Sequence, residues 1–430
     1  MISVLVIAIL TVLCFIFSIL LFPQVSVGTR RIKLYPIIPL VGGVCMLAFG
    51  GVHLSNIIKA FTEDSSVNPI RIFVLFFSMT IFSLLLDETG FFEHISGVIL
   101  QKAGHSQHRI FLSLYSIISL LTVFTSNDIV ILTFTPFICH FCKAARIDAV
   151  PYLIMEFVAA NTWSLLLLIG NPTNIYISGA FEIGFLEYMK VMALPTVAAG
   201  MVSLLVMALL FRKKLAGEIM THTTVTPIHD RPMMWIALLH LGGCVMLLTV
   251  SQYIGLQMWL IALAMAVSAV LCSALCLAVR RKGLRCVGQA IAKMPYEIIP
   301  FILGMFVIVL ALEESGLTAM TAQLLSFDHS VFSYGILSFF ASNILNNIPM
   351  SVLFSKILNF GSESGQIYAT IIGSNLGAFL TPVGALAGIM WLNLLKQNKI
   401  KLSTLRFVVL GGLIGIPAIM AALFVLQLSV

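Results

Sequence analysis

Charged residues are scarce in this chain. Of its 430 residues only 10% are Asp, Glu, Lys or Arg, whereas 60% are hydrophobic. Soluble domains carry about 25% charged residues, so this composition excludes an ordinary soluble domain. The apolar residues fall into blocks of roughly 17–25 residues, the length that a helix needs to cross a bilayer. We therefore expect an all-α, polytopic membrane protein.

Several functional signals are also missing. The chain has no Gly-x-x-x-x-Gly-Lys-Ser/Thr phosphate loop, so it shows no means of hydrolysing ATP itself. No basic region precedes the first apolar block, because the first basic residue is Arg30, and no cleavable signal peptide is therefore expected. We predict neither an enzyme nor a cofactor. The net charge of +7 comes from short loops, so it indicates membrane orientation and no nucleic-acid partner.

Cysteines are few, and most lie in or beside the apolar blocks, which argues against a disulfide framework. One pair, Cys139 and Cys142, has the spacing of half a metal site. A zinc site needs about four ligands, and no second pair follows. We therefore predict no metal and favour a structural role for this pair, with a thiol trap for a soft metalloid as the alternative.

The apolar blocks predict ten full crossings, two of them interrupted (148–181 and 366–396). The other eight cover residues 2–22, 36–58, 70–87, 189–211, 233–250, 256–279, 296–312 and 404–428. Residues 110–142 and 330–360 differ, because each has two apolar limbs around a polar tip. The limbs look too short to cross a bilayer alone, so we predict two re-entrant hairpins.

The basic residues indicate an orientation. If the N-terminus lies outside, 20 of the 24 Lys and Arg residues fall in six loops on the cytoplasmic side. Such a bias is typical of proteins in the cell membrane. Both termini are then outside, the hairpin at 110–142 enters from the cytoplasm, and the hairpin at 330–360 enters from outside.

The chain divides into two similar halves. Residues 1–212 and 233–430 each contain five crossings and one hairpin, joined by a cytoplasmic linker at 213–232. Five is an odd number, so the second repeat is predicted to be inverted relative to the first. Inverted repeats of this kind build transporters with a solute site near the middle of the bilayer.

Short motifs agree with this division. Asp-Glu-Thr-Gly at 87–90 matches Glu-Glu-Ser-Gly at 313–316, and Asn-Asp-Ile at 127–129 matches Asn-Asn-Ile at 346–348. Polar backbone at membrane depth is costly unless it lines a protein cavity. The matched polar tips therefore predict one solute site that is shared by the two halves.

The interrupted crossings add further polar groups. The breaks lie near 170–174 and 375–384, where Asn171 and Thr381 directly precede prolines. Asn and Thr are good N-caps and proline suits the first turn of a helix, so each crossing is expected to restart as a half-helix. Its first N–H groups are then free to face a solute.

The tips and breaks together define a predicted substrate site. Its amide and hydroxyl groups donate and accept hydrogen bonds, which suits a small hydroxyl-rich or oxyanionic solute; the alternative is that these residues only cap broken helices. The predicted substrate-binding residues are Thr125, Ser126, Asn127, Asn171, Thr173, Asn174, Asn346, Asn347, Asn375 and Thr381.

Two acids lie within the predicted crossings and tips, Asp128 and Glu156. Ionisable residues at membrane depth are costly and commonly serve proton or cation pathways. We predict proton coupling for both. Asp128 is the better candidate because it lies at the tip of the first hairpin, whereas Glu156 has a structural role as its alternative.

At these motifs the chain resembles the membrane subunits of arsenite efflux pumps, which belong to a superfamily with citrate and sodium–proton carriers. The resemblance covers residues from about 36 to the end. It rests on residues 84–92 (LLLDETGFF), 127–128 (ND), 170–174 (GNPTN), 303–305 (LGM), 346–350 (NNIPM) and 376–391 (LGAFLTPVGALAGIMW).

The resemblance implies two inverted repeats with paired hairpins, and export of neutral arsenite or antimonite in exchange for protons. An accessory ATPase subunit can attach to some members. The substrate would be held by Asn127, Asp128, Asn171, Thr173, Asn174, Asn346, Asn347 and Thr381.

Other functions stay open at this point. A sodium–proton antiporter would use the same acids. A carrier of di- or tricarboxylates or another anion would prefer positive groups near the site, although half-helix N-termini can replace them. A membrane scaffold or receptor would not need two polar breaks.

Overall fold

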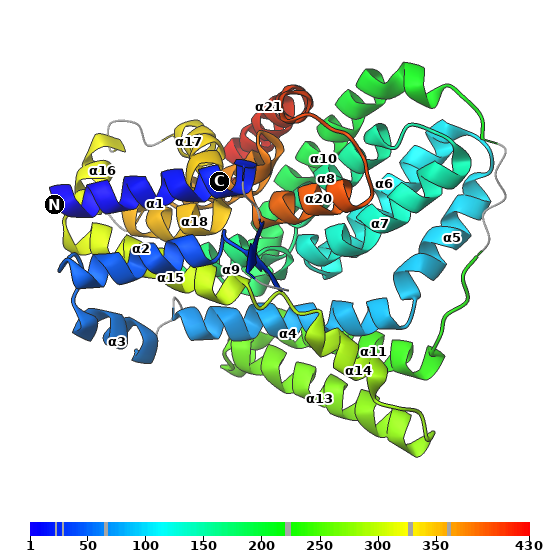
Figure 1. The fold of residues 1–430 in the computed structure, drawn as a ribbon, viewed down its shortest axis with the longest axis horizontal. Helices are drawn as coiled ribbons and strands as arrows, with labels where there is room; N and C mark the ends of the chain where they lie inside the picture. Colours follow the sequence, from blue (N-terminus) through cyan, green and yellow to red (C-terminus); the bar gives the residue numbers. More distant parts are fainter. Residues whose placement is uncertain (22–23, 28–29, 64–67, 220–224, 326–329, 359–362) are drawn as a thin grey trace.

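The computed structural model describes residues 1–21, 24–27, 30–63, 68–219, 225–325, 330–358 and 363–430. Nearly all of this chain is α-helical (Figure 1). By length and composition, eight described helices could each cross a membrane, which confirms the expected polytopic all-α class. They are α1 (Ile2–Leu21), α4 (Pro69–Glu88), α6 (Gln107–Phe124), α7 (Asn127–Ala145), α10 (Phe185–Leu215), α11 (Arg231–Thr249), α13 (Met258–Val279) and α21 (Thr404–Ser429).

Shorter helices connect and interrupt these spans. They are α2 (Ile37–Ala48), α3 (Leu54–Thr62), α5 (Phe91–Ala103), α8 (Val150–Trp163), α9 (Pro172–Ala180), α12 (Ser251–Ile254), α14 (Arg285–Ala292), α15 (Ile298–Glu314), α16 (Leu317–Leu325), α17 (Val331–Leu345), α18 (Asn347–Leu358), α19 (Ser364–Leu376) and α20 (Leu386–Gln397). Three 3₁₀ turns lie at the two breaks, η1 (Leu168–Gly170), η2 (Gly377–Phe379) and η3 (Pro382–Gly384). Residues 220–224 of the predicted linker and 359–360 of the second hairpin lie outside the described residues.

One small β-ribbon departs from the all-α expectation. Strand β1 (Gln24–Val27) pairs antiparallel with β2 (Arg30–Lys33) in the predicted loop between the first two crossings. Lys33 at the end of β2 forms an ion pair with Glu297, whose Oε1 lies 2.7 Å from the lysine Nζ. The ribbon is thereby tied to the start of α15.

The predicted continuous crossing at 36–58 is wrong. Helix α2 ends at Ala48, and α3 begins only at Leu54. Gly50 lies between them with a φ of 68°, a conformation that glycine adopts at little cost. Helix α3 buries none of its residues and carries its apolar side chains on one face, which suits a helix lying along a surface.

Of the two predicted hairpins, only the second has the short limbs that were expected. Helices α17 and α18 have 15 and 12 residues, which is short for a crossing. Helices α6 and α7 have 18 and 19 residues and are each long and apolar enough to span a membrane, so the expected shortness of the first pair is wrong. That the first pair is re-entrant stays a prediction, because helices of this length suit either a hairpin or two crossings.

The helices pack in two groups. In the first group α2 packs along α15, and α4, α11 and α13 pack together. In the second group α10 packs along α21, and α17 packs along α19. Glycine permits the α17–α19 contact, because a Cβ on Gly373 would lie 2.2 Å from the carbonyl oxygen of Gly335. The polar tips and breaks belong to the second group, which also contains α6–α9, α18 and α20 (Figure 1).

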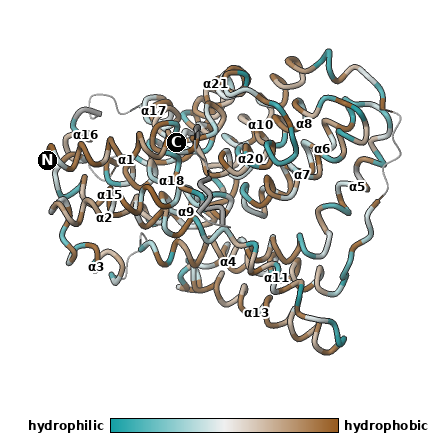
Figure 2. The backbone as a smooth tube through the Cα atoms, viewed as in Figure 1, coloured by the Kyte–Doolittle hydropathy of each residue, from teal (hydrophilic) through white to brown (hydrophobic). Residues whose placement is uncertain are grey.

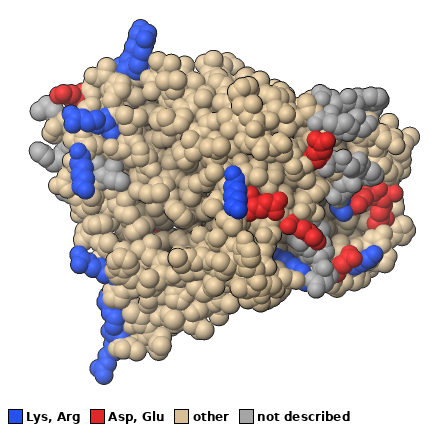
Figure 3. All heavy atoms as spheres, turned by 180° about the vertical axis from the view of Figure 1, so that it is seen from behind, with Lys and Arg blue, Asp and Glu red and all other residues tan. Residues whose placement is uncertain are grey.

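Polar and charged residues are distributed as expected for a helical membrane protein. Figure 2 shows mainly hydrophobic helices, with hydrophilic residues concentrated in the connections. In Figure 3 most visible Lys and Arg side chains lie along one edge of the molecule, whereas most visible Asp and Glu side chains lie toward the opposite edge, together with a few Lys or Arg. Large apolar side chains such as Leu205, Leu209 and Leu271 are exposed along the outside of long helices. The surface is therefore that of a multi-pass membrane protein.

Candidate functional site

The first hairpin turns through a short polar tip. Helix α6 ends at Phe124, and Thr125 follows in an extended conformation. Ser126 caps α7, because its hydroxyl accepts a hydrogen bond from the backbone N–H of Asp128 at 3.3 Å. The amide of Asn127 reaches across to α8 and donates to the Oδ1 atom of Asn161 at 3.1 Å. The tip is thus fixed to the first interrupted crossing.

The second hairpin turns at Asn346. This residue has a φ of 73° and a ψ of 151°, a backbone conformation that is essentially confined to glycine and is strained in asparagine. Its side chain donates to the carbonyl oxygen of Val383 at 2.8 Å, and its Oδ1 atom accepts from the N–H of Ile348 at 3.4 Å. Asn346 therefore joins the second tip to the second break.

The first break forms as predicted. Helix α8 ends at Trp163, and α9 restarts at Pro172 with Asn171 as its N-cap. The Oδ1 atom of Asn171 accepts from the N–H of Thr173 at 3.1 Å and from its hydroxyl at 3.2 Å. Both hydrogen bonds come from the residue after the proline, so the sequence Asn-Pro-Thr supplies its own cap.

The second break differs from the prediction. Thr381 does not cap a new α-helix, since only the 3₁₀ turn η3 follows it and α20 begins later, at Leu386. The hydroxyl and the N–H of Thr381 both donate to the Oδ1 atom of Asn343 on α17, at 2.8 and 2.9 Å. The side-chain amide of Asn343 donates in turn to the carbonyl of Gly377 at 2.9 Å. Hydrogen bonds with Asn343 of the neighbouring hairpin therefore stabilise the backbone of this break.

The two breaks meet at Asn375, at the end of α19. Its amide donates to the Oδ1 atom of Asn174 at 2.8 Å and, more weakly, to the hydroxyl of Thr173 at 3.4 Å. Its own Oδ1 atom accepts from Ser164 at 3.4 Å. Residues about 200 positions apart thus form one buried polar network at the centre of the second helix group.

The predicted site residues are almost all buried. Eleven of the twelve, including both acids, are less than 9% exposed, and Thr381 is half-buried. Asn161 and Ser164 connect the first tip and the first break to Asn375 at the end of α19. Asn343 and Asn346 connect the second hairpin to the second break. No hydrogen bond joins the two tips directly within the described residues.

Two polar atoms of this set have no hydrogen-bond partner among the described residues. One is the side-chain nitrogen of Asn171 in the first break, and the other is the Oδ1 atom of Asn347 at the second tip. Both are buried, and an unpaired buried polar atom costs about 1–3 kcal/mol. They offer a donor from one half of the chain and an acceptor from the other.

The two acids have different surroundings. Glu156 accepts from the hydroxyl of Thr135 at 2.7 Å and from the indole N–H of Trp391 at 3.3 Å. The carboxylate of Asp128 accepts no hydrogen bond within the described part of the chain, although the residue is only 3% exposed. Among the described residues the Asp128 carboxylate at the tip thus has no hydrogen-bond donor, whereas both oxygens of Glu156 have one.

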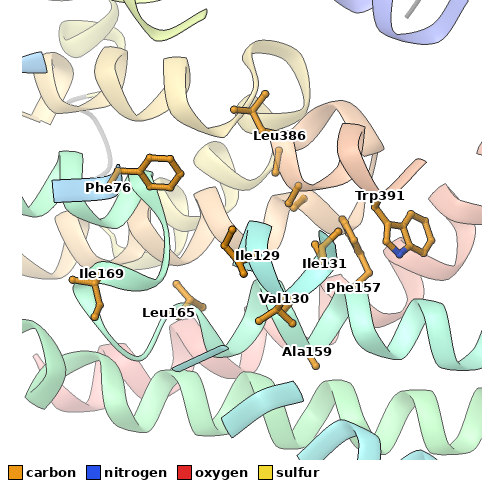
Figure 4. Packing of buried hydrophobic residues seen from close by; sticks show 14 of the residues in the cluster. Phe76, Ile129, Val130, Ile131, Phe157, Ala159, Leu165, Ile169, Leu386 and Trp391 are labelled. Carbon is orange, nitrogen blue, oxygen red and sulfur yellow. The ribbon is translucent and has the colours of Figure 1, made fainter. Parts of the chain in front are cut away.

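Apolar packing joins the network of Glu156 to both halves of the chain. Figure 4 shows Ile131 of α7 beside Phe157 of α8, with Trp391 of α20 next to Phe157. The rings of Phe157 and Trp391 lie 5.0 Å apart. The start of α7 and the restarted helix α20 are therefore parts of one close-packed body.

The matched acid pairs lie at helix ends. Lys293 binds both acids of the first pair, with its Nζ 2.9 Å from Asp87 and 2.6 Å from Glu88. Although partial burial disfavours its charge, the hydrogen bonds that Lys293 donates to these carboxylates raise its pKa above the usual value. Thr133 of α7 also donates to Asp87 at 3.3 Å. This pair therefore anchors a helix end to the first hairpin.

The second pair has an equivalent arrangement at the end of α15. Glu313 forms an ion pair with Lys356 of α18 at 3.1 Å, and Glu314 accepts from His53 and Asn56 at 2.9 and 2.8 Å. Glycine with a positive φ follows each pair, at 75° in Gly90 and 78° in Gly316. The matched motifs thus adopt the same backbone turn and contact a hairpin in each half.

Sequence reasoning missed several polar partners. Asn161, Ser164 and Asn343 connect the predicted residues, and Thr135 and Trp391 hold Glu156. The position of Asn343, one helical turn before the second tip, is the one local signal that would have indicated its role.

Comparison with known proteins decides the family. The family model for citrate transporters, CitMHS, matches residues 12–365. The chain belongs to the CitMHS family. This CitMHS member is 27% identical over 412 residues to the arsenical pump membrane protein of Escherichia coli, covering 90% of the chain and 92% of the relative. It is also 28% identical over 374 residues to the arsenical pump membrane protein of Yersinia enterocolitica, covering 82% and 85%.

A solved structure supports the fold of this family member. The YdaH transporter of Alcanivorax borkumensis superimposes with a TM-score of 0.58, covering 99% of the chain and 97% of that protein, at 14% identity. At this identity the likeness concerns the fold alone. Together with the family match it identifies the chain as a multi-pass membrane transporter, and the resemblance to arsenical pumps is confirmed.

Proposed function

We propose that this transporter exports arsenite or antimonite across the cell membrane in exchange for protons. Two observations carry the proposal: the donor of Asn171 and the acceptor of Asn347 are buried without a hydrogen-bond partner among the described residues, and the two breaks share a buried network of neutral side chains. A neutral trihydroxylated solute both donates and accepts hydrogen bonds, so it can satisfy both atoms. The names of the arsenical pump relatives point to the same solute.

Asp128 is the proton-exchanging acid in this proposal. Its carboxylate lies at the tip of the first hairpin, close to the amide network, and no described side chain donates to it. An acid in such a position can bind a proton when the solute leaves and release it when the solute arrives. We assign Glu156 a supporting role, because Thr135 and Trp391 already occupy its two oxygens.

The proposed mechanism uses two inverted repeats. In each half a hairpin is followed by a broken crossing and a long helix: α6 to α10 in the first half, and α17 to α21 in the second. The matched turns at Gly90 and Gly316 support this equivalence. Inversion would give each tip access from opposite sides of the membrane, with both termini outside, and would allow inward-facing and outward-facing states.

A carrier for citrate or a similar carboxylate is the second candidate, because the matching family model carries that description. A citrate site would need positive groups or free helix N-termini for several negative charges. Among the described residues that hydrogen-bond within the tips and breaks, none is Lys or Arg. Helices α7, α9 and α18 begin at the tips and the first break, so the site offers helix N-termini without a cationic side chain. This favours a neutral solute over one with several negative charges.

Transport into everted vesicles tests the proposal. The chain is expressed in bacteria that lack arsenite efflux, and radioactive arsenite uptake is measured with and without an imposed pH gradient. We expect uptake that disappears when an ionophore collapses the gradient and that excess citrate does not inhibit. Uptake of labelled citrate, with no uptake of arsenite or antimonite, would contradict the proposal.

A further inference from the structure

A cavity lies at the far end of α7 from the tip. Its volume is about 730 Å³, and its walls come from the end of α7, the start of α8 and the residues after α20. It contains Lys143, Lys399 and Lys401, which belong to loops that the charge distribution assigns to the cytoplasm. A hydrated solute from the cytoplasm could therefore enter it.

Two thiols line this cavity. Cys139 and Cys142 are three residues apart on α7, so their side chains lie on the same face of the helix. Both are free cysteines, and they are only 4% and 1% exposed. The cavity is therefore the route by which a small molecule can reach them.

Polar groups surround the pair, but they do not complete a metal site. His140, Gln397 and Asn398 are polar parts of the wall, and Asp148 is paired with Lys214. Among the described residues no group of three or more His, Cys, Asp or Glu side chains could hold a metal ion, so a metal that needs four protein ligands does not fit. Two soft sulfur ligands suit a thiophilic centre that keeps a hydroxyl group as its third ligand.

We propose that Cys139 and Cys142 form a reversible dithiol site for a trivalent metalloid hydroxide, arsenite or antimonite. The inference rests on the proposed function and adds a second binding site to it. Binding breaks two As–O bonds of As(OH)₃ and forms two As–S bonds. The two thiol protons leave with the two hydroxyl groups as water, and the arsenic stays trivalent.

The dithiol site is separate from the polar tips. Cys139 lies 11 residues after Asp128 on the same helix, which corresponds to about 16 Å along the axis. The cavity therefore holds metalloid on the cytoplasmic side of the tips. Binding there concentrates the solute next to the transport site and is not itself a transport step.

The chain offers a matched control pair. Cys272 and Cys276 are four residues apart on α13, also on one helix face, but they do not line this cavity. The full chain is purified as wild type, as Cys139→Ser/Cys142→Ser and as Cys272→Ser/Cys276→Ser. Each protein is treated with phenylarsine oxide, and its intact mass is measured after washing with 2-mercaptoethanol or with the dithiol 2,3-dimercaptopropanol.

We expect the wild type and the α13 variant to retain phenylarsine oxide through the monothiol wash and to lose it in the dithiol wash. The Cys139→Ser/Cys142→Ser variant should lose the adduct that the α13 variant retains. Retention of that adduct by the α7 variant would overturn the proposal. In wild type, arsenite should also slow maleimide labelling of Cys139 and Cys142, located by peptide mapping; unchanged labelling would overturn the proposal even if the serine variant did not fold.

Transport measurements distinguish the dithiol site from the proposed transport function. In everted vesicles the Cys139→Ser/Cys142→Ser variant should need more arsenite for half-maximal uptake and should keep the maximal rate of the wild type. If the wild type binds metalloid at the thiols but does not transport arsenite, the transport proposal is contradicted and the dithiol site is still supported. Unchanged half-maximal concentration would refute the role in concentrating the solute.

Discussion

The two halves of the molecule interrupt a crossing with similar residues but stabilise the interruption differently. In the first half Asn171 precedes Pro172 and caps the helix that starts there. In the second half Thr381 precedes Pro382, yet the α-helix starts only at Leu386. A polar residue before a proline therefore predicts a break but does not determine where the next helix begins.

The reason lies in the partner of each polar side chain. Asn171 bonds to a residue of its own half-helix, Thr173, whereas both donors of Thr381 are used by Asn343 from the adjacent hairpin. The first break is thus a local property of its sequence. The second depends on tertiary packing, because its polar groups bond to the adjacent hairpin.

The two hairpin tips differ in charge. The first tip carries Asn127 and Asp128, and the matched positions of the second carry Asn346 and Asn347. One half therefore supplies an acid and the other supplies only amides. In the proposed exchange cycle this places the proton on the first hairpin, while both hairpins contact the solute.

Removing the acid from the first tip should have the largest effect. We expect Asp128→Asn to abolish uptake driven by a pH gradient, because the amide cannot carry the exchanged proton. The control is Asp230→Asn, since Asp230 caps α11, belongs to neither tip, and is paired with Arg280 and Lys282. Gradient-driven uptake at the wild-type rate in Asp128→Asn would show that the acid at the tip is not the coupling group.

The second acid should affect stability more than coupling. In Glu156→Gln, the side-chain amide can place only one oxygen opposite the donors of Thr135 and Trp391. One buried donor then loses its acceptor, which costs about 1–3 kcal/mol. We expect a lower midpoint of thermal unfolding in detergent but retained dependence of uptake on the pH gradient. Loss of that dependence in a folded variant would make Glu156 a coupling acid.

Sequence predicted the helical class, the polar tips and the first break, because these depend on composition, spacing and local capping. It did not predict the late start of α20, since that depends on Asn343 approaching from another helix. It also missed the break in the crossing at 36–58, where Gly50 and Gly51 lie inside a continuous apolar block. The hydrophobic pattern predicts which residues avoid water, but it does not predict where a helix ends or bends.

The site shows the same division. The sequence identified side chains that interrupt apolar runs, and the structure joins several of them through Asn375. Their connecting partners, Asn161 and Ser164, were missed because they lie within a crossing and have no neighbouring proline to mark them. Partners that act across 200 residues are set by the packing of the two halves.

The support of the second break can be tested with Asn343→Ala. This change leaves the N–H and hydroxyl of Thr381 without their acceptor and removes a donor to Gly377. We expect a loss of about 2 kcal/mol in unfolding free energy. Thr381→Val, which removes the hydroxyl alone, should cost less. Equal stability of Asn343→Ala and wild type in denaturant titration would show that packing across the hairpin does not support the break.

The first break should be the less sensitive of the two. Asn171→Ala removes an N-cap, which typically costs about 1 kcal/mol, and Asn171→Ser should restore most of it, because serine also caps. Arsenite binding should not recover in the serine variant, since serine lacks the amide nitrogen that has no partner among the described residues and that we assign to the solute. Recovery of both stability and arsenite affinity would reduce Asn171 to a capping residue.

A structure with bound solute tests most directly whether the two polar tips form one substrate pocket. Antimonite is suitable for cryo-electron microscopy because antimony scatters strongly, and the Cys139→Ser/Cys142→Ser variant removes the competing thiols. We predict a single strong peak within hydrogen-bonding distance of Asn171 and Asn347, with Asp128 nearby. Antimony bound elsewhere in the protein, or tips separated by lipid or bulk water, would contradict a shared pocket.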